Sequence, residues 1–157
     1  MFMKLLRKLI RYILNLPMVQ EEINNMVRQN VAAILTKEEF DDTDWIYISS
    51  IGVLSEDVLR KYKDKINWSG ICRYQILSES FMKEHQFYLD WDAVSQYQKL
   101  SDKFMREFDT AVNFNLISQY QILSEKFIID YHKKLDLDII VKYQNLSNDT
   151  IMNWYRL

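Results

Sequence analysis

Apolar residues recur from residue 54 to residue 145 at the spacing of short helices. After one Leu-Ser pair, apolar side chains follow at Val58, Leu59, Tyr62 and Ile66, and these intervals place them on one helix face. A second apolar run begins where an Asp or Asn precedes a large apolar residue, and an Ile or Val follows three positions later. The pattern predicts a pair of helices, the first of about 10 residues and the second shorter.

The helix pair repeats with a constant period of 23 residues, which three independent markers share. The Leu-Ser pair begins at Leu54, Leu77, Leu100, Leu123 and Leu146. The Tyr-Gln pair begins at Tyr74, Tyr97, Tyr120 and Tyr143. The Asp or Asn before the large apolar residue is Asp44, Asn67, Asp90, Asn113 or Asp136. Because one unit cannot bury its apolar face alone, the period predicts an all-α fold, an α-solenoid of short two-helix repeats of 23 residues.

The period also divides the chain into two regions. We expect residues 1–34 to form an N-terminal helical cap and residues 35–157 to form the repeat array. Within the array, a degenerate unit precedes four complete units and a C-terminal half unit, and these span residues 35–53, 54–76, 77–99, 100–122, 123–145 and 146–157.

Capping side chains are expected to make the turns of the array. The Ser of each Leu-Ser pair is a good N-cap for the first helix, and an acidic residue follows it in most units. The recurring Asp or Asn is the expected N-cap of the second helix. Since the chain holds only 2 Gly and 1 Pro, we expect connectors of about two or three residues closed by caps. Such connectors leave no loop for a catalytic site.

The repeat resembles a known type. Its consensus, Leu-Ser-Glu-x-Phe-Ile, then Asp-Trp, then Ile-Ser-x-Tyr-Gln, is clearest in residues 77–82, 89–91 and 94–98. It resembles tandem helical repeats that are abundant in proteins of giant DNA viruses and some bacteriophages, and the resemblance covers residues 35–157. The resemblance implies a virus-encoded protein without enzyme activity, and by analogy one that blocks a host defence complex.

The composition narrows the class of protein. A hydrophobic content of 48% and a net charge of −2 argue against a disordered chain and against a nucleic-acid binder. The one cysteine, Cys72, cannot form an internal disulfide, which favours a reducing compartment. No apolar run reaches the roughly 20 residues of a membrane span. We therefore expect the chain in the cytoplasm of the host cell.

The N-terminal segment differs from the array in charge. Residues 1–34 carry a net charge of +3, whereas residues 35–157 carry −5. Residues 2–16 are amphipathic, and their polar arc holds the basic residues Lys4, Arg7, Lys8 and Arg11. The preferred interpretation is a helical cap on the solenoid. The alternatives are a helix that binds a membrane surface or a partner, and the opposite charges also favour head-to-tail self-association.

The titratable side chains support no catalytic site. His85 takes the place of a core aromatic residue, and His132 matches Lys63, Gln86 and Asp109, so we expect it at an exposed position. Cys72 replaces a serine found in other units, which is typical of a small packing residue. Neither a metal site nor a catalytic triad is predicted, so we expect no enzyme activity and no cofactor.

The Tyr-Gln pairs allow two interpretations. In the preferred one they are structural: each Tyr packs between units, and each Gln amide bonds to backbone carbonyl groups of a neighbouring unit. In the alternative, the four pairs line a surface groove.

Residues that depart from the repeat are the candidates for binding. Phe87 and Tyr88 replace pairs that are polar or small in other units, so we expect them to anchor a protein partner. Weaker departures of the same kind are Tyr47, Leu116, Ile129 and Ile139. The alternative for all six is a local packing contact. The sequence thus predicts a non-enzymatic protein that binds a host or viral protein. The second hypothesis is a peripheral membrane or assembly scaffold anchored by the basic helix.

Deleting residues 1–16 separates these two hypotheses. If the segment is a cap, the shortened chain unfolds at lower temperature because a polar end cover is lost, and the full chain does not sediment with anionic liposomes. Melting followed by circular dichroism and liposome sedimentation measure the two effects. A full chain that sediments with liposomes, together with an unchanged melting temperature after deletion, contradicts the cap.

Overall fold

The computed structural model describes residues 21, 42–50 and 54–156, and the side chains of residues 42–44 are outside this description. The predicted basic residues Lys4, Arg7, Lys8 and Arg11, and the predicted cap that contains them, lie outside the described residues. The chain divides into two compact units, Met1–Ile66 and Asn67–Leu157.

All regular structure in the described ranges is helical, and no strand occurs there. The first unit contains α3 (Asp42–Ser50) and α4 (Glu56–Lys61). The second unit contains α5 (Trp68–Tyr74), α6 (Glu79–Glu84), α7 (Trp91–Tyr97), α8 (Asp102–Glu107), α9 (Phe114–Tyr120), α10 (Glu125–Asp130), α11 (Leu137–Tyr143) and α12 (Asn148–Trp154).

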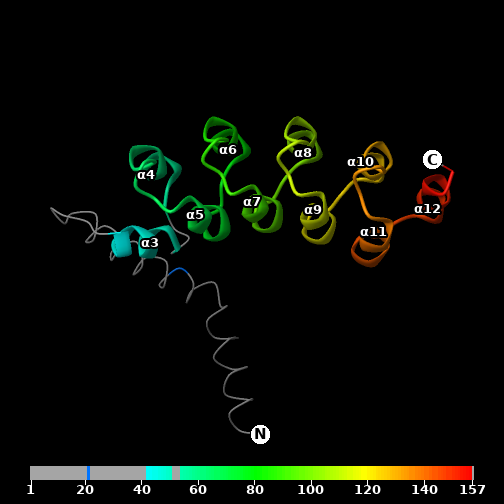
Figure 1. Cartoon of the computed structure of the whole chain (residues 1–157), viewed down its shortest axis with the longest axis horizontal. Coiled ribbons are helices and arrows are strands. Elements are labelled where there is room, and N and C mark those ends of the chain that lie inside the picture. Colours follow the sequence, from blue (N-terminus) through cyan, green and yellow to red (C-terminus); the bar gives the residue numbers. More distant parts are fainter. Residues whose placement is uncertain (1–20, 22–41, 51–53, 157) are drawn as a thin grey trace, which may run out of the picture. The chain divides into compact units, whose positions relative to one another are not determined.

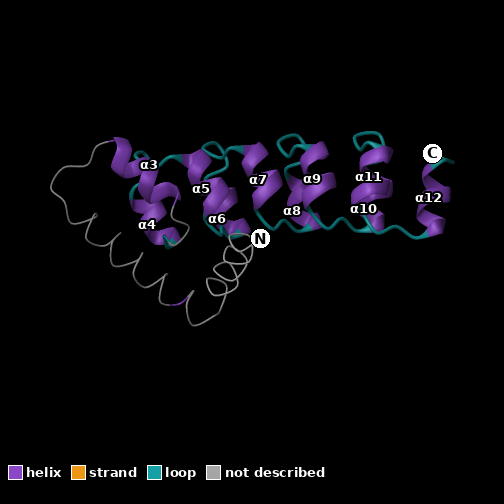
Figure 2. Cartoon of the chain, turned by 90° about the horizontal axis from the view of Figure 1, so that it is seen from below, coloured by secondary structure: helices purple, strands orange, loops and turns teal. Residues whose placement is uncertain are grey.

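The helices of the second unit form two rows that follow the sequence repeat. In Figure 1, α5, α7, α9 and α11 lie in one row, and α6, α8, α10 and α12 lie in the other. Each helix starts 23 residues after the preceding helix of its row. Figure 2 shows successive helices of a row side by side, and α5, α7, α9 and α11 contact one another in turn. The predicted all-α helical-repeat solenoid is confirmed.

The predicted N-caps are confirmed wherever a cap is described. Each capping residue has an extended backbone, and its side-chain oxygen accepts a hydrogen bond from the first turn, as in Phe81 N–H to Ser78 Oγ at 3.1 Å. The caps of α4, α6, α8, α10 and α12 are Ser55, Ser78, Ser101, Ser124 and Ser147. The caps of α5, α7, α9 and α11 are Asn67, Asp90, Asn113 and Asp136.

The prediction for Asp44 is wrong. Helix α3 begins at Asp42, so Asp44 is inside the helix and is not its cap. Asp44 belongs to the degenerate unit, in which the helix starts earlier than Trp45, the start that the repeat predicts.

The predicted helix lengths are also wrong for the first helix of each pair. Helices α4, α6, α8 and α10 have six residues, whereas α5, α7, α9 and α11 have seven, so the prediction that the second helix is the shorter one is also wrong. The first helix ends at an aromatic C-cap such as Tyr62, where φ is −113° and ψ is 22°. A further turn follows, in which Ile66 N–H donates to the Tyr62 carbonyl at 3.2 Å. This turn keeps apolar residues at helical spacing beyond the helix itself, so the pattern overstates the length.

The connectors are longer than predicted. Four residues, 75–78, separate α5 from α6, and six residues, 62–67, separate α4 from α5. The extra length is the turn after each first helix and the extended residues around each serine cap.

Phenylalanines at one repeat position form the centre of the core. Phe81, Phe104 and Phe127 are completely or almost completely buried, and each is followed by a fully buried Met or Ile. Each Phe ring packs against the aromatic C-cap four residues on, with centroids 4.3 Å apart for Phe81 and His85. Full burial of such a side chain stabilises the fold by roughly 1.5–3 kcal/mol.

Glutamine side chains join neighbouring units of the array. The Gln121 amide nitrogen Nε2 donates to the Ser95 carbonyl at 2.9 Å and to the Gln98 carbonyl at 2.7 Å. Its oxygen Oε1 accepts from Leu100 N–H at 3.0 Å. Gln98 and Gln144 make the same three bonds one unit earlier and one unit later. The predicted structural role of the glutamines is confirmed, and we call this set the glutamine ladder.

Carboxylates also join the units, at the serine caps. Glu79 Oε1 accepts a hydrogen bond from Ser101 N–H at 2.6 Å, and Glu125 Oε1 accepts one from Ser147 N–H at 2.8 Å. Hydrogen bonding by Thr150, then by Ser147, holds the pKa of Glu125 below its ordinary value. These first-turn acids therefore stabilise the following unit as well as their own helix.

Replacing Gln121 with Met is expected to lower the free energy of unfolding by about 3 kcal/mol or more, because two carbonyl groups and one N–H lose a partner. Met retains the side-chain volume. Gln119→Met, at a half-buried position outside the ladder, is the control and is expected to change stability by less than about 0.5 kcal/mol. Urea denaturation measures both. Equal effects of the two substitutions would show that the ladder does not stabilise the array.

Asp90 makes the free energy of unfolding depend on pH in the acid range. Hydrogen bonds from the Ser69 hydroxyl and then from Ala93 N–H lower its pKa below the ordinary value of 3.8. A lowered pKa in the folded state contributes stability above pH 3.8 that is lost as the pH falls below that value.

Asp90→Asn is therefore expected to be less stable than the wild type at pH 7, with a difference that shrinks below about pH 4. Asn already occupies this cap position at Asn67 and Asn113, so capping is retained. Urea denaturation at several pH values measures the difference. Ser69→Ala, which removes the main cause of the shift, should weaken the pH dependence. A difference that is independent of pH would contradict this assignment.

Candidate binding surface

Phe87 and Tyr88 lie in the turn between α6 and α7, and the structure separates their roles. The Phe87 side chain is 93% exposed. Tyr88 is 44% exposed, and its ring stacks on Trp68 with centroids 5.3 Å apart. Tyr88 therefore has the local packing contact that was the alternative interpretation, whereas Phe87 projects into solvent.

The other predicted binding residues do not gather around Phe87 in the repeat. Tyr47 is in α3, in the first unit, and is about half exposed. Leu116 and Ile139 are half-buried and occupy the same position of the neighbouring helices α9 and α11. Ile129 is half-buried in α10, in the other row. Of the six, only Phe87 is nearly fully exposed.

A row of tyrosines lies on the surface, although the preferred sequence interpretation placed each tyrosine between units. The row consists of Tyr74, Tyr97, Tyr120 and Tyr143 at the ends of α5, α7, α9 and α11, and each ring is 47–52% exposed. The tyrosines are therefore not enclosed between units as the glutamines are. This exposure agrees with the alternative interpretation of a surface groove.

Two isoleucines on the same surface were not predicted at all. Ile76 and Ile122 are 95% and 94% exposed, and each lies two residues after a tyrosine of the row. The equivalent residues of the other units are Val53, Lys99 and Asn145. Comparison of this position across the units could have identified the isoleucines, because Lys99 and Asn145 at the same position are typical of a solvent-exposed site.

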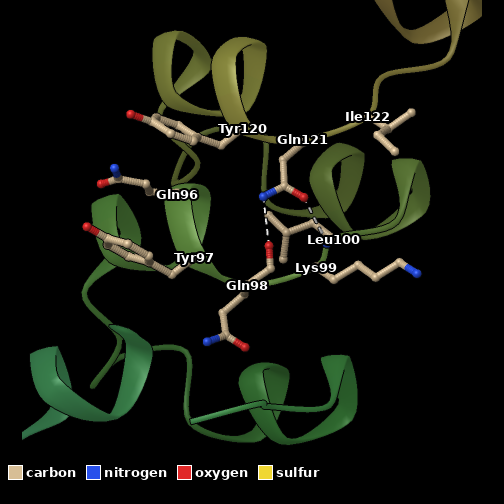
Figure 3. A pocket seen from close by; sticks show the side chains of 8 residues that line it. All are labelled: Gln96, Tyr97, Gln98, Lys99, Leu100, Tyr120, Gln121 and Ile122. Atoms are coloured by element: carbon tan, nitrogen blue, oxygen red, sulfur yellow. Dashed lines mark hydrogen bonds between the residues drawn. The ribbon is translucent and has the colours of Figure 1, made fainter. Parts of the chain in front are cut away.

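A hollow of about 370 Å³ lies between two tyrosines of the row. Figure 3 shows the Tyr97 and Tyr120 rings on one side with Gln96 between them, and Lys99 and Ile122 on the other side. The floor is formed by Gln98, Leu100 and the ladder residue Gln121. We call this hollow, with its eight lining residues, the tyrosine groove.

The charges along the tyrosine row are all positive. Lys99 is the one charged residue that lines the groove. The Arg73 guanidinium lies 5.3 Å from the Tyr97 ring centroid, and Lys142 Nζ lies 5.0 Å from that of Tyr143. No Asp or Glu occurs among residues 73–76, 96–99, 119–122 and 142–145. These four segments therefore offer an acidic ligand no carboxylate of their own, and the carboxylate in electrostatic reach of Arg73 is that of Asp90, which already accepts hydrogen bonds from Ser69 and Ala93.

The histidines and the cysteine lie within packed surroundings. His85 is buried as predicted, and its Nδ1 is 3.2 Å from the Phe81 carbonyl oxygen, in reach of a hydrogen bond that the ring donates. His132 is half-buried, not exposed as predicted, because Trp154 of α12 packs against it with centroids 6.4 Å apart. Burial raises the pKa of the Cys72 thiol to about 11, so the thiol stays neutral, as suits a packing residue.

Within the ranges that the structure covers, no group of His, Cys, Asp and Glu has the composition of a metal site. No helix in those ranges has the length and apolar character needed to cross a membrane.

Comparison of the chain with family models, with curated proteins and with solved structures gives no match. What the surface binds is therefore inferred from its own side chains.

Proposed function

We propose that this chain is a non-enzymatic helical-repeat protein that binds another protein, with Phe87 as an anchor. The observation that carries the proposal is the 93% exposure of Phe87. The equivalent residues in other units are Asp64, Thr110 and Lys133, all suited to solvent. An exposed aromatic side chain at a position that is otherwise polar is typical of an interface.

The scaffold beneath Phe87 favours binding. The turn that carries it is fixed by Tyr88 N–H, which donates to the His85 carbonyl at 2.9 Å, and by the stack of Tyr88 on Trp68. A residue held in place before binding loses little conformational freedom when a partner covers it. The backbone that carries Phe87 is therefore fixed before binding, and only the rotamer freedom of its exposed side chain is lost when a partner covers it.

The resemblance of the repeat to those of giant viruses and bacteriophages supports a more specific form of the proposal. In this form the chain is virus-encoded, acts in the host cytoplasm and inhibits a host defence complex by covering one of its surfaces. The chain's one cysteine, Cys72, is free and buried, and the lack of a disulfide pair is consistent with a reducing compartment.

A peripheral membrane or assembly scaffold is the second candidate. It is favoured by the basic arc of residues 2–16, whose charge suits an anionic lipid surface. Head-to-tail self-association through the opposite charges of the two regions belongs to this candidate. Deletion of residues 1–16 distinguishes it from the first.

Phe87→Ser tests the first candidate. Wild-type and variant chains are used to capture proteins from the native cell, and the captured proteins are quantified by mass spectrometry. We expect at least one protein to be reduced about tenfold or more by the substitution, because the anchor is lost. Thr110→Ser, at the same repeat position one unit later, is the control and should leave capture unchanged.

The melting temperature of Phe87→Ser should match that of the wild type, because the side chain makes little contact within the described fold. Tyr88 is left intact because its ring supports Trp68. Equal capture by the wild type and Phe87→Ser would contradict the assignment of Phe87. Failure of the wild type to retain any protein in preference to a blank support would contradict the proposed function.

A further inference from the structure

The tyrosine groove combines an apolar and aromatic surface with polar groups that are not engaged in hydrogen bonds of the fold. The Tyr97 and Tyr120 rings and Ile122 supply apolar surface. The Gln96 amide and the Tyr97 and Tyr120 hydroxyls make no hydrogen bond within the described part of the chain. A ligand that offers both apolar side chains and backbone amide groups would use both kinds of surface.

The glutamine amides in the floor of the groove are already hydrogen-bonded within the fold and do not bind the ligand. Both hydrogens of the Gln121 amide are donated to carbonyl groups, at 2.9 and 2.7 Å. The same is true of Gln98, which donates to Cys72 and Gln75 carbonyls at 2.7 Å each. The ladder therefore fixes the floor, and the groups available to a ligand stand along its edges.

The repeat spacing suits an extended polypeptide. Packed helices lie about 8–10 Å apart, and an extended chain advances about 3.3 Å per residue. One repeat therefore corresponds to about three residues of a bound peptide. From Tyr74 to Tyr143, three intervals correspond to about nine residues of peptide.

The positive charge along the tyrosine row favours an acidic peptide. Lys99 lies on the side of the groove opposite Tyr97 and Tyr120. Arg73 and Lys142 lie beside the rings of Tyr97 and Tyr143, so positive charge accompanies the row over several units. The nearest carboxylates by sequence, such as Glu79, already accept hydrogen bonds from the serine cap of the next unit. Three cations are few for a nucleic-acid backbone, which carries a phosphate on every nucleotide.

From this arrangement we propose that the tyrosine row, centred on the tyrosine groove, binds an extended acidic peptide segment of a partner protein. This inference rests on the proposed function, protein binding, and adds a second surface with a partner of stated chemistry. The peptide lies across the ends of α7 and α9, its side chains enter between Tyr97 and Tyr120, and its carboxylates face Lys99.

Selection from a displayed library of random twelve-residue peptides tests the proposal, with the full chain immobilised. We expect the selected peptides to carry a net negative charge. We also expect the Tyr97→Ala/Tyr120→Ala variant to bind them about tenfold or more weakly, because two exposed aromatic contacts are lost. Tyr155→Ala is the control, since Tyr155 is also exposed but lies at the end of α12, outside the tyrosine row.

A second variant, Lys99→Glu, tests the charge without removing an aromatic ring. Lys99 is exposed, so the fold should tolerate the change, and affinity for the acidic peptides should fall about tenfold. Melting curves of all variants verify that they are folded.

Three results would overturn the proposal: selected peptides that are neutral or basic, selected peptides whose binding is unaffected by the double tyrosine variant, or no selected peptides at all. Binding of a fluorescent dT12 oligonucleotide that depends on Tyr97 and Tyr120 would overturn it in favour of a nucleic acid. The Phe87 experiment uses another surface, so either proposal can fail while the other stands.

Discussion

The hydrogen bonds of the glutamine ladder are the constraint on which the rest of the array depends. A short helix of seven residues leaves most of its carbonyl groups without a partner in the same helix. In this array one glutamine per unit satisfies two such carbonyls of the preceding unit and one N–H of its connector. Each unit is therefore completed by the next one, which explains why helices of six and seven residues are stable here.

The ladder also determines what the surface can present. Gln121 faces inward because it donates to two carbonyl groups of the preceding unit and accepts from Leu100 N–H in the connector that joins the two units. Tyr120 then points away from the ladder toward solvent. A Tyr-Gln pair thus combines one residue that joins the units with one that is available on the surface. Because the pair recurs with the fold, the surface row is a consequence of the scaffold, and the variable residues beside it, such as Lys99 and Ile122, adjust its chemistry.

Features that recur in every unit could be predicted from the sequence, whereas features that depend on contacts with an adjacent unit could not. The period, the serine caps and the inward role of Gln98 follow from local chemistry that recurs in every unit, and these predictions are confirmed. The length of α6 was overestimated because His85 continues the apolar spacing in a turn after the helix has ended. The exposure of Tyr97 could not be predicted from spacing, since it depends on which faces the adjacent units cover. His132 is similar: only the position of Trp154 explains its partial burial.

The two kinds of exposed aromatic residue imply two kinds of contact. Phe87 occurs once, where other units carry Asp64 or Thr110, so it can mark a single point on a partner. The tyrosines recur with the period, so they match a ligand that is itself extended and has a similar translation per unit. A folded partner with an acidic extended segment could engage both, the fold through Phe87 and the segment through the row. Two linked contacts of moderate strength would then give an affinity that neither surface reaches alone.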